Sequence, residues 1–245
     1  MTNRTAFVSG SGRNIGRAIV LEFARAGCNV IVNGSANEEA CNRVAEEASG
    51  HGVEAAVVMG DVGDSGAVGK MAAQALAQFG AVDIVVNNAS IRPSKPFLEM
   101  DDEYWHHVIS VDMHAAFYTG RAFVPGMVER GWGRVINITG MNAIHGYAGR
   151  APVSVAKHGL WGLTKSMAKE FGPNGITVNA ISPGPIRGER DDPEMSKHIE
   201  ETAAKIPLKR MGEPEHIAGL CGYLISEAAE FTTGQMIACN GGGQT

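Results

Sequence analysis

Residues 5–23 read TAFVSGSGRNIGRAIVLEF, and this stretch decides the fold. The run 5–9 is short and mainly apolar, as in a buried strand, and Ile15 and Ile19 then recur one helical turn apart. The loop 10–16 between them is rich in glycine. Glycines allow a tight turn and let backbone N–H groups and the positive helix N-terminus approach a pyrophosphate. The stretch predicts a strand, a dinucleotide-binding loop and a helix; a tight turn without a ligand is the plainer alternative.

The rest of the chain continues this alternation. Strands separated by helices imply right-handed crossovers and a doubly wound parallel sheet. No linker, repeat or low-complexity segment interrupts residues 1–245, so we expect a single α/β domain, a Rossmann fold of about seven strands with helices on both faces. Besides the first strand and helix, we expect strands at 29–33, 54–59, 84–88, 134–139, 177–181 and 235–239, and helices at 38–49, 65–79, 101–130 with a kink near Pro125, 154–171, 194–205 and 213–226.

Composition and charge narrow the classes of ligand. The formal net charge is −5, so we expect neither nucleic acid nor a membrane surface as partner, and small-molecule substrates are favoured. The four cysteines are dispersed without a CxxC pair, which argues against a zinc site and a disulfide framework. We expect no metal. A reduced cytoplasm fits this pattern, and neither a leader segment nor an apolar run near the ~18 residues of a membrane span is expected.

Several short motifs give nearly the whole chain a family resemblance. The loop 10–16 resembles the TGxxxGxG loop of the short-chain dehydrogenase/reductase family, with Ser9 in place of the threonine and Asn14 in place of the middle glycine. Further matches are Asp61-Val62, Asn87-Asn88-Ala89, Lys157, Pro183-Gly184, Thr233-Gly234-Gln235 and Asn240-Gly241-Gly242. The resemblance implies a nicotinamide dinucleotide cofactor, and it is nearest to the 3-oxoacyl carrier-protein reductases and the sugar or polyol dehydrogenases of the family.

The resemblance also implies which residues bind the cofactor. Asp61 and Val62 would contact adenine, and Asn87 and Ala89 would line the cofactor cleft. Lys157 would hold the hydroxyl groups of the nicotinamide ribose. The expected cofactor-binding set is Gly10, Gly12, Arg13, Asn14, Ile15, Gly16, Asn33, Ser35, Asp61, Val62, Asn87, Ala89, Lys157, Pro183, Gly184 and Ile186.

Charge at the end of the second strand favours NADP(H), with NAD(H) as the alternative. Members that prefer NAD place an acid there for the 2′-hydroxyl, whereas this chain has Gly34-Ser35 and no acid before Glu38. Arg13 matches the basic residue that pairs with the 2′-phosphate in NADP-preferring members, and Asn33 and Ser35 would add donors. A solvated surface arginine is the competing interpretation of Arg13.

At the catalytic positions the chain departs from the family pattern. Members use a tyrosine as general acid and base in a YxxxK pair, a serine that binds the reacting oxygen, and an asparagine that holds a relay water. Counting back from Lys157, the tyrosine position holds Val153, the serine position holds Gly140, and the asparagine position holds Asp112. The threonine that grips the nicotinamide carboxamide falls at Gly188. Of the usual set, Lys157 remains.

Nearby polar residues are the candidates for a replacement proton donor. The segment 139–152 would cover the substrate side of the cofactor, with Gly140, Asn142 and Val153 in the substrate pocket. Tyr147 and His145 in this segment are catalytic candidates, although a loop tyrosine or histidine can equally pack at a subunit surface or face solvent. Asp112 is a candidate proton carrier beside Lys157, and a structural salt bridge is the competing interpretation.

Three functions are therefore open. The first is an NADP-dependent oxidoreductase acting on a carbonyl or alcohol with a non-standard proton donor. The second is a non-redox enzyme, such as a lyase, isomerase or hydratase, on the same scaffold. The third is a cofactor-binding protein without turnover. Retention of Lys157 and the cofactor motifs favours the first and third, whereas loss of the usual acid favours the second and third.

Two further expectations concern assembly and the substrate side. Relatives pair the long helix and the helix that carries the lysine, so we expect a homotetramer formed through the helices around Phe117 and Trp161. The polar segment 186–206 is expected to form a lid over the substrate. Arg190, Glu194 and His198 within it would meet a polar or charged substrate, although surface exposure alone accounts for them.

Overall fold

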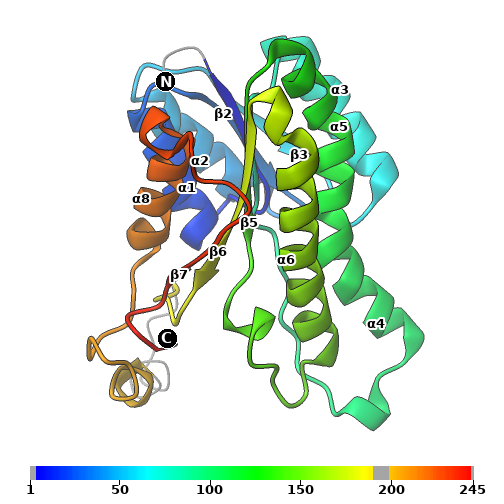
Figure 1. Ribbon diagram of the computed structural model, residues 1–245, viewed down its shortest axis with the longest axis vertical. Helices are drawn as coiled ribbons and strands as arrows, with labels where there is room; N and C mark the ends of the chain where they lie inside the picture. Colours follow the sequence, from blue (N-terminus) through cyan, green and yellow to red (C-terminus); the bar gives the residue numbers. More distant parts are fainter. Residues whose placement is uncertain (1–3, 190–198, 244–245) are drawn as a thin grey trace.

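A computed structural model describes residues 4–189 and 199–243 and contains a seven-stranded, all-parallel sheet (Figure 1). The strand order is β3-β2-β1-β4-β5-β6-β7, in which the chain winds outward from β1 in both directions. The predicted doubly wound sheet is therefore confirmed. The strands are β1 (Thr5–Val8), β2 (Asn29–Gly34), β3 (Ala55–Met59), β4 (Ile84–Asn87), β5 (Gly133–Ile138), β6 (Ile176–Pro183) and β7 (Met236–Cys239).

Helices cover both faces of the sheet (Figure 1). One layer contains α1 (Asn14–Arg25), α2 (Glu38–Ser49) and α8 (Pro214–Ile225), and the other contains α3 (Ser65–Phe79), α5 (Ala115–Arg130) and α6 (Ala151–Phe171), with α4 (Asp102–Ile109) leading into α5. Residues 190–198, which include Arg190, Glu194, His198 and the start of the helix expected at 194–205, lie outside the described residues.

The central strands are apolar on both faces because both faces are covered. Phe7 of β1 pairs with Ile31 of β2 and Val85 of β4, and these three side chains belong to the core under α3, α5 and α6. Their neighbours Val8 and Val32 belong to the core under α1, α2 and α8. This accounts for the continuous apolar runs that identified the strands, since a parallel sheet leaves no solvent-facing side to carry polar residues.

The long helix expected at 101–130 is divided. A π-helical turn, Ser110–His114, separates α4 from α5, and Pro125 lies within α5 rather than at the break. This interruption was not predicted from the sequence. A π-turn inserts an extra residue into the helical ladder and often marks a functional site. Here the inserted turn carries Asp112.

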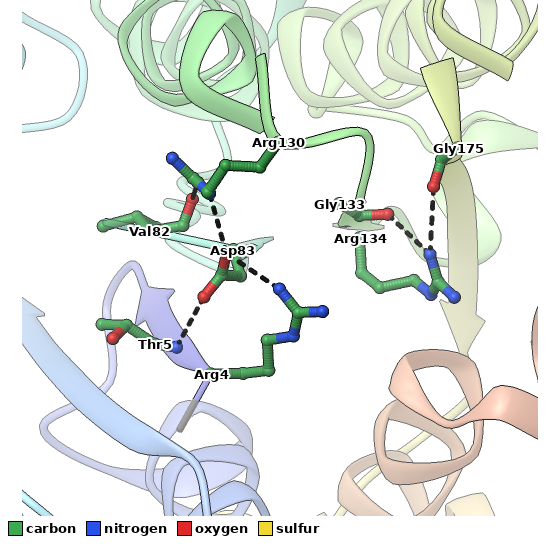
Figure 2. A network of polar contacts seen from close by, with 8 residues as sticks. All are labelled: Arg4, Thr5, Val82, Asp83, Arg130, Gly133, Arg134 and Gly175. Carbon is green, nitrogen blue, oxygen red and sulfur yellow. Dashed lines mark hydrogen bonds and ion pairs between the residues drawn. The ribbon is translucent and has the colours of Figure 1, made fainter. Parts of the chain in front are cut away.

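At the amino ends of the strands, a buried carboxylate ties several elements together (Figure 2). Asp83 accepts hydrogen bonds from the Thr5 backbone N–H at 3.1 Å, from Arg4 at 3.4 Å and from Arg130 at 3.2 Å. Arg130 also donates to the Val82 carbonyl at 2.9 Å. The side chain of Asp83 is 5% exposed. Asp83 thus joins β1, β4 and α5 at the edge opposite the strands' carboxyl ends.

Replacing Asp83 with alanine should lower the free energy of unfolding by about 2–4 kcal/mol, because two arginines and a backbone N–H lose one shared buried acceptor. Glu39→Ala is the control, since it removes only an exposed ion pair with Arg43 and should cost below about 0.5 kcal/mol. Urea unfolding followed by circular dichroism measures both. Equal losses for the two variants would contradict a structural role for Asp83.

Candidate cofactor cleft and active site

A cleft of about 570 Å³ opens where β1, β2, β3 and β4 end. Its walls are the loop 10–16, the residues after β2 and β3, and the segment 88–92 after β4. Open parallel sheets bind ligands at this edge, beside the point where the strand order reverses. Eleven members of the expected cofactor-binding set line the cleft, namely Gly10, Gly12, Arg13, Asn14, Ile15, Gly16, Asn33, Ser35, Asp61, Val62 and Ala89.

Two glycines of the loop, Gly10 and Gly16, leave no room for a side chain. Gly10 has a φ of +60°, and a Cβ atom there would lie 2.8 Å from the Ala89 Cα. A Cβ atom at Gly16 would lie 2.5 Å from the Gly10 carbonyl oxygen. Helix α1 therefore starts close against β1 and β4, and backbone groups, rather than side chains, form the floor of the cleft at this point.

Asn33 braces the glycine loop instead of offering a free donor. Its side-chain oxygen accepts the Gly10 N–H at 3.2 Å, and its amide nitrogen donates to the carbonyls of Val58 at 3.0 Å and Gly60 at 3.2 Å. Of the donors expected around a 2′-phosphate, Arg13 is the exposed cationic one.

The N-terminus of α1 already holds an anionic group from elsewhere in the chain. The Asn14 N–H donates to the Glu189 carboxylate at 2.8 Å, and Glu189 follows β6, far away in the sequence. The buried side-chain oxygen of Asn14 has no hydrogen-bond partner among the described residues. The N-cap, Arg13, gives no side-chain cap. The carboxylate stands where a helix N-terminus favours an anion, so the loop suits a phosphate.

Next to the cleft lies a buried ion pair. The Lys157 Nζ is 3.5 Å from the Asp112 Oδ2, and it donates to the Ile138 carbonyl at 3.1 Å. The two side chains are 4% and 0% exposed. Burial lowers the pKa of Lys157, Asp112 opposes this by raising it, and Arg92 lowers it further. The ammonium therefore holds its proton less tightly than a solvated lysine does.

Asp112 is held by three donors. Besides Lys157, the Ser90 hydroxyl donates to its Oδ2 at 2.7 Å and the Ile91 N–H donates to its Oδ1 at 2.8 Å. Ser90, Ile91 and Arg92 line the cleft, and Ser90 is exposed. Sequence reasoning missed Ser90, although it directly follows the Asn87-Asn88-Ala89 motif at the end of β4, where site residues gather.

The other expected catalytic residues, Tyr147 and His145, do not bond to this ion pair in the described part of the structure. Tyr147 and His145 are exposed, and among the described residues no hydrogen bond joins either to Lys157 or Asp112. Val153 is fully buried in the first turn of α6. Gly140 has a φ of +121°. Asn142 lies in a short helical turn, and its side chain is outside the described part of the structure.

Several expected cofactor residues lie outside the main cleft. Asn87 is buried, donates to the Asn137 side chain at 2.8 Å and accepts from Thr119 at 2.7 Å. Pro183 ends β6, and a Cβ atom at the following Gly184 would lie 2.6 Å from the Asn240 Cα. Beyond them, Ile186 lines a separate cavity of about 110 Å³.

The structure describes the helix faces expected to form subunit contacts. Phe117 of α5 is half exposed and packs against Tyr118, and Lys165 lies over the Trp161 ring on α6. Within residues 4–189 and 199–243 no helix is long and apolar enough to cross a bilayer. In the same ranges, no group of three or more acidic, histidine or cysteine side chains is arranged to hold a metal ion.

Comparisons with known proteins place the chain in a family. The model described as Enoyl-(Acyl carrier protein) reductase matches residues 10–244. The chain is 35% identical over 240 residues to the 3-oxoacyl-[acyl-carrier-protein] reductase of Staphylococcus epidermidis, covering 98% of each protein. It is 37% identical over 242 residues to the Nodulation protein G of Azospirillum brasilense, covering 99% of this chain and 98% of the other.

A solved structure is similar to this chain over nearly the whole length of both proteins. A putative short-chain alcohol dehydrogenase from Sinorhizobium meliloti superposes with a TM-score of 0.93 at 30% identity, covering 99% of this chain and 96% of that one. The chain belongs to the short-chain dehydrogenase/reductase family, a family of oxidoreductases. Its relatives include 3-oxoacyl-[acyl-carrier-protein] reductases and a protein described as a putative short-chain alcohol dehydrogenase.

Replacing Asp112 with asparagine should lower the free energy of unfolding by about 3 kcal/mol, because it leaves a buried ammonium without its counter-charge. The pKa of Lys157 should fall further, since the Asp112 charge raises it. Urea unfolding and NMR titration of the lysine Cε in the cofactor-free protein measure the two effects.

Asp64→Asn is the matched control, because asparagine caps a helix as well as aspartate does, and the Asp64 side chain caps α3. Its unfolding free energy and the Lys157 titration should stay at the wild-type values. An unchanged Lys157 titration in Asp112→Asn would contradict the ion pair.

Proposed function

We propose that this protein is an NADP(H)-dependent oxidoreductase that interconverts a carbonyl and an alcohol on a small-molecule substrate, using a non-standard proton donor. The observation that carries the proposal is the position of the buried Lys157–Asp112 pair beside a glycine-lined cleft with room for a dinucleotide. A nicotinamide cofactor supplies the hydride when it is bound. The chain's own residues must bind it, hold the substrate and move a proton.

The residues lining the cleft fit a phosphorylated dinucleotide. The loop and the N-terminus of α1 suit the pyrophosphate, and Asp61 and Val62, which line the cleft, would contact the adenine as the family resemblance implies. Gly34 at the end of β2 and the following residues 35–37 carry no acidic group that would repel a 2′-phosphate, and Arg13 lines the same cleft. These features favour NADP(H) over NAD(H). Lys157 would hold the nicotinamide ribose.

The proton has to come from an unusual group. By the family resemblance, Val153 and Gly140 stand where the usual acid and its serine partner are found, and neither side chain can donate a proton. A positioned general acid contributes about 10²–10⁴ in rate. The Asp112–Lys157 pair is buried next to the cleft and carries a proton whose release burial favours, which supports a displaced proton source.

Substrate class and assembly complete the proposal. The similarity to a 3-oxoacyl-[acyl-carrier-protein] reductase supports an activated carbonyl, such as a 3-oxoacyl thioester, as the first class to try. We propose a cytoplasmic homotetramer formed through α5 and α6. The dispersed spacing of the four cysteines, with no CxxC pair, supports a reducing compartment.

The test is loss of NADPH absorbance with 3-oxoacyl thioesters, ketones and imines, run beside fluorescence titrations of NADPH and NADH. Turnover of one class with NADPH is the expected result. Tight NADPH binding without turnover of any class would overturn the oxidoreductase proposal and favour the non-redox or non-catalytic alternatives. Equal affinities for the two nucleotides would overturn the choice of cofactor.

Replacing Arg13 with alanine should weaken NADPH binding about 10–100-fold, because one charge-assisted contact to a phosphate is lost. NADH binding should change less than about twofold. The control is Arg17→Ala, since Arg17 lies one helical turn further on and pairs with Glu47 at the surface. Fluorescence titration of both nucleotides measures the outcome. An equal loss of NADH affinity would show that Arg13 does not contact the 2′-phosphate.

Replacing Glu189 with glutamine should tighten NADPH binding about 3–10-fold, because a phosphate no longer has to displace a carboxylate from the Asn14 N–H. The control, Glu47→Gln, makes the same charge change at the exposed partner of Arg17 and should leave NADPH affinity unchanged. Calorimetric titration measures both. Tightening by the control as well would mean that general charge, not Glu189, sets the affinity.

A further inference from the structure

Three polar side chains form a line from the interior to the cleft. The Lys157 Nζ lies 3.5 Å from the Asp112 Oδ2, and the Ser90 Oγ donates to the same oxygen at 2.7 Å. The lysine and aspartate side chains are 4% and 0% exposed, so neither presents a surface to a substrate. Ser90 is exposed and lines the cleft. Ser90 is therefore the member of this line of hydrogen-bonding groups that reaches the cleft.

The carboxylate does not need Ser90 to be buried stably. Its charge is balanced by Lys157, and its other oxygen accepts the Ile91 N–H at 2.8 Å. Ser90 adds a hydroxyl that faces the cleft and shares an acceptor with a buried ammonium. A hydroxyl both donates and accepts, so it can pass a proton outward while it takes one from Asp112.

We propose that the Ser90 hydroxyl delivers the proton to the substrate oxygen and that Lys157 replenishes it through Asp112. This assignment rests on the proposed oxidoreductase function and identifies Ser90 as its non-standard proton donor. Ser90 touches the substrate in this scheme and is a catalytic residue. Asp112 carries the proton, and Lys157 is its reservoir.

The step balances as follows for carbonyl reduction. The carbonyl carbon gains a hydride, for which the nicotinamide cofactor is the co-reactant, and the carbonyl oxygen gains the Ser90 proton. For this transfer the Ser90 hydroxyl turns its hydrogen from the Asp112 Oδ2, to which it donates in the structure, toward the substrate oxygen, and the Lys157 ammonium gives a proton to the Asp112 carboxylate. As the Ser90 O–H bond breaks, its oxygen takes that proton from the Asp112 carboxyl group, which becomes a carboxylate again. Lys157 is left as a neutral amine, and solvent restores its proton along the same line after the product leaves.

The charged surroundings favour this direction. Burial lowers the pKa of Lys157 and so do the nearby charges of Arg92, whereas Asp112 raises it. The charged groups that act on the ammonium are therefore Asp112 on the π-turn and Arg92 on the segment after β4. Reduction should fall as pH rises through the pKa of Lys157, because the neutral amine has no proton to supply.

The experiment compares Ser90→Ala with Ser90→Thr, which keeps the hydroxyl, and with Ser94→Ala, a control serine further along the same segment. Each variant is measured by NADPH titration, thermal unfolding and single-turnover reduction as a function of pH. We expect Ser90→Ala to bind NADPH within twofold of wild type, to unfold at the same temperature, and to reduce substrate about 100-fold more slowly. Its alkaline loss of rate should disappear.

Ser90→Thr should recover reduction to within about tenfold of wild type and keep the alkaline loss, and Ser94→Ala should match wild type throughout. Wild-type reduction by Ser90→Ala would overturn the role of Ser90 while leaving the oxidoreductase proposal intact. Loss of NADPH binding in Ser90→Ala would also overturn it, because the serine would then position the cofactor. No reduction by the wild type, with NADPH bound, would overturn both proposals.

Discussion

All seven strands point the same way, and this single constraint places everything else. Parallel strands need helical crossovers, the crossovers cover both faces, and both faces must then be apolar. Polar side chains that bind ligands or take part in chemistry therefore lie mainly at the ends of the strands. At the carboxyl ends, the segments after β1, β2, β3 and β4 meet in one cleft. At the amino ends, Asp83 and its arginines close the opposite edge.

The two edges handle buried charge differently. Asp83 is shared by two arginines that reach solvent along part of their length, so its charge is well compensated and static. Lys157 is buried with one carboxylate, and burial favours its neutral form. A pair of this kind is costly to keep for stability alone. Its position beside the cleft is the basis of the role in proton transfer that we propose for it, and the Asp83 network lies at the opposite edge of the sheet.

Local pattern was enough to predict the sheet, most of the helices that the structure describes and most of the residues that line the cleft. The strands are apolar runs in the sequence. Gly10 and Gly16 occupy positions where a Cβ atom would collide with backbone, so the glycines of the loop are also a sequence signal. Contacts between distant segments could not be predicted from local pattern. Glu189, which follows β6, accepts the Asn14 N–H, and no motif near either residue indicates this contact. The π-turn at Ser110–His114 was not predicted, because helix propensity does not encode an inserted residue.

Gly140 has a consequence for how this chain can change over time. With a φ of +121°, its backbone lies where residues with side chains rarely sit. A mutation to serine would bring back the hydroxyl that the family resemblance leads one to expect, but only in a strained backbone. A tyrosine at Val153 would in addition have to fit a fully buried position. Neither reversal is a small step by itself. A serine at position 140 together with a tyrosine at position 153 would therefore need accompanying changes in the backbone around Gly140 and in the packing around Val153.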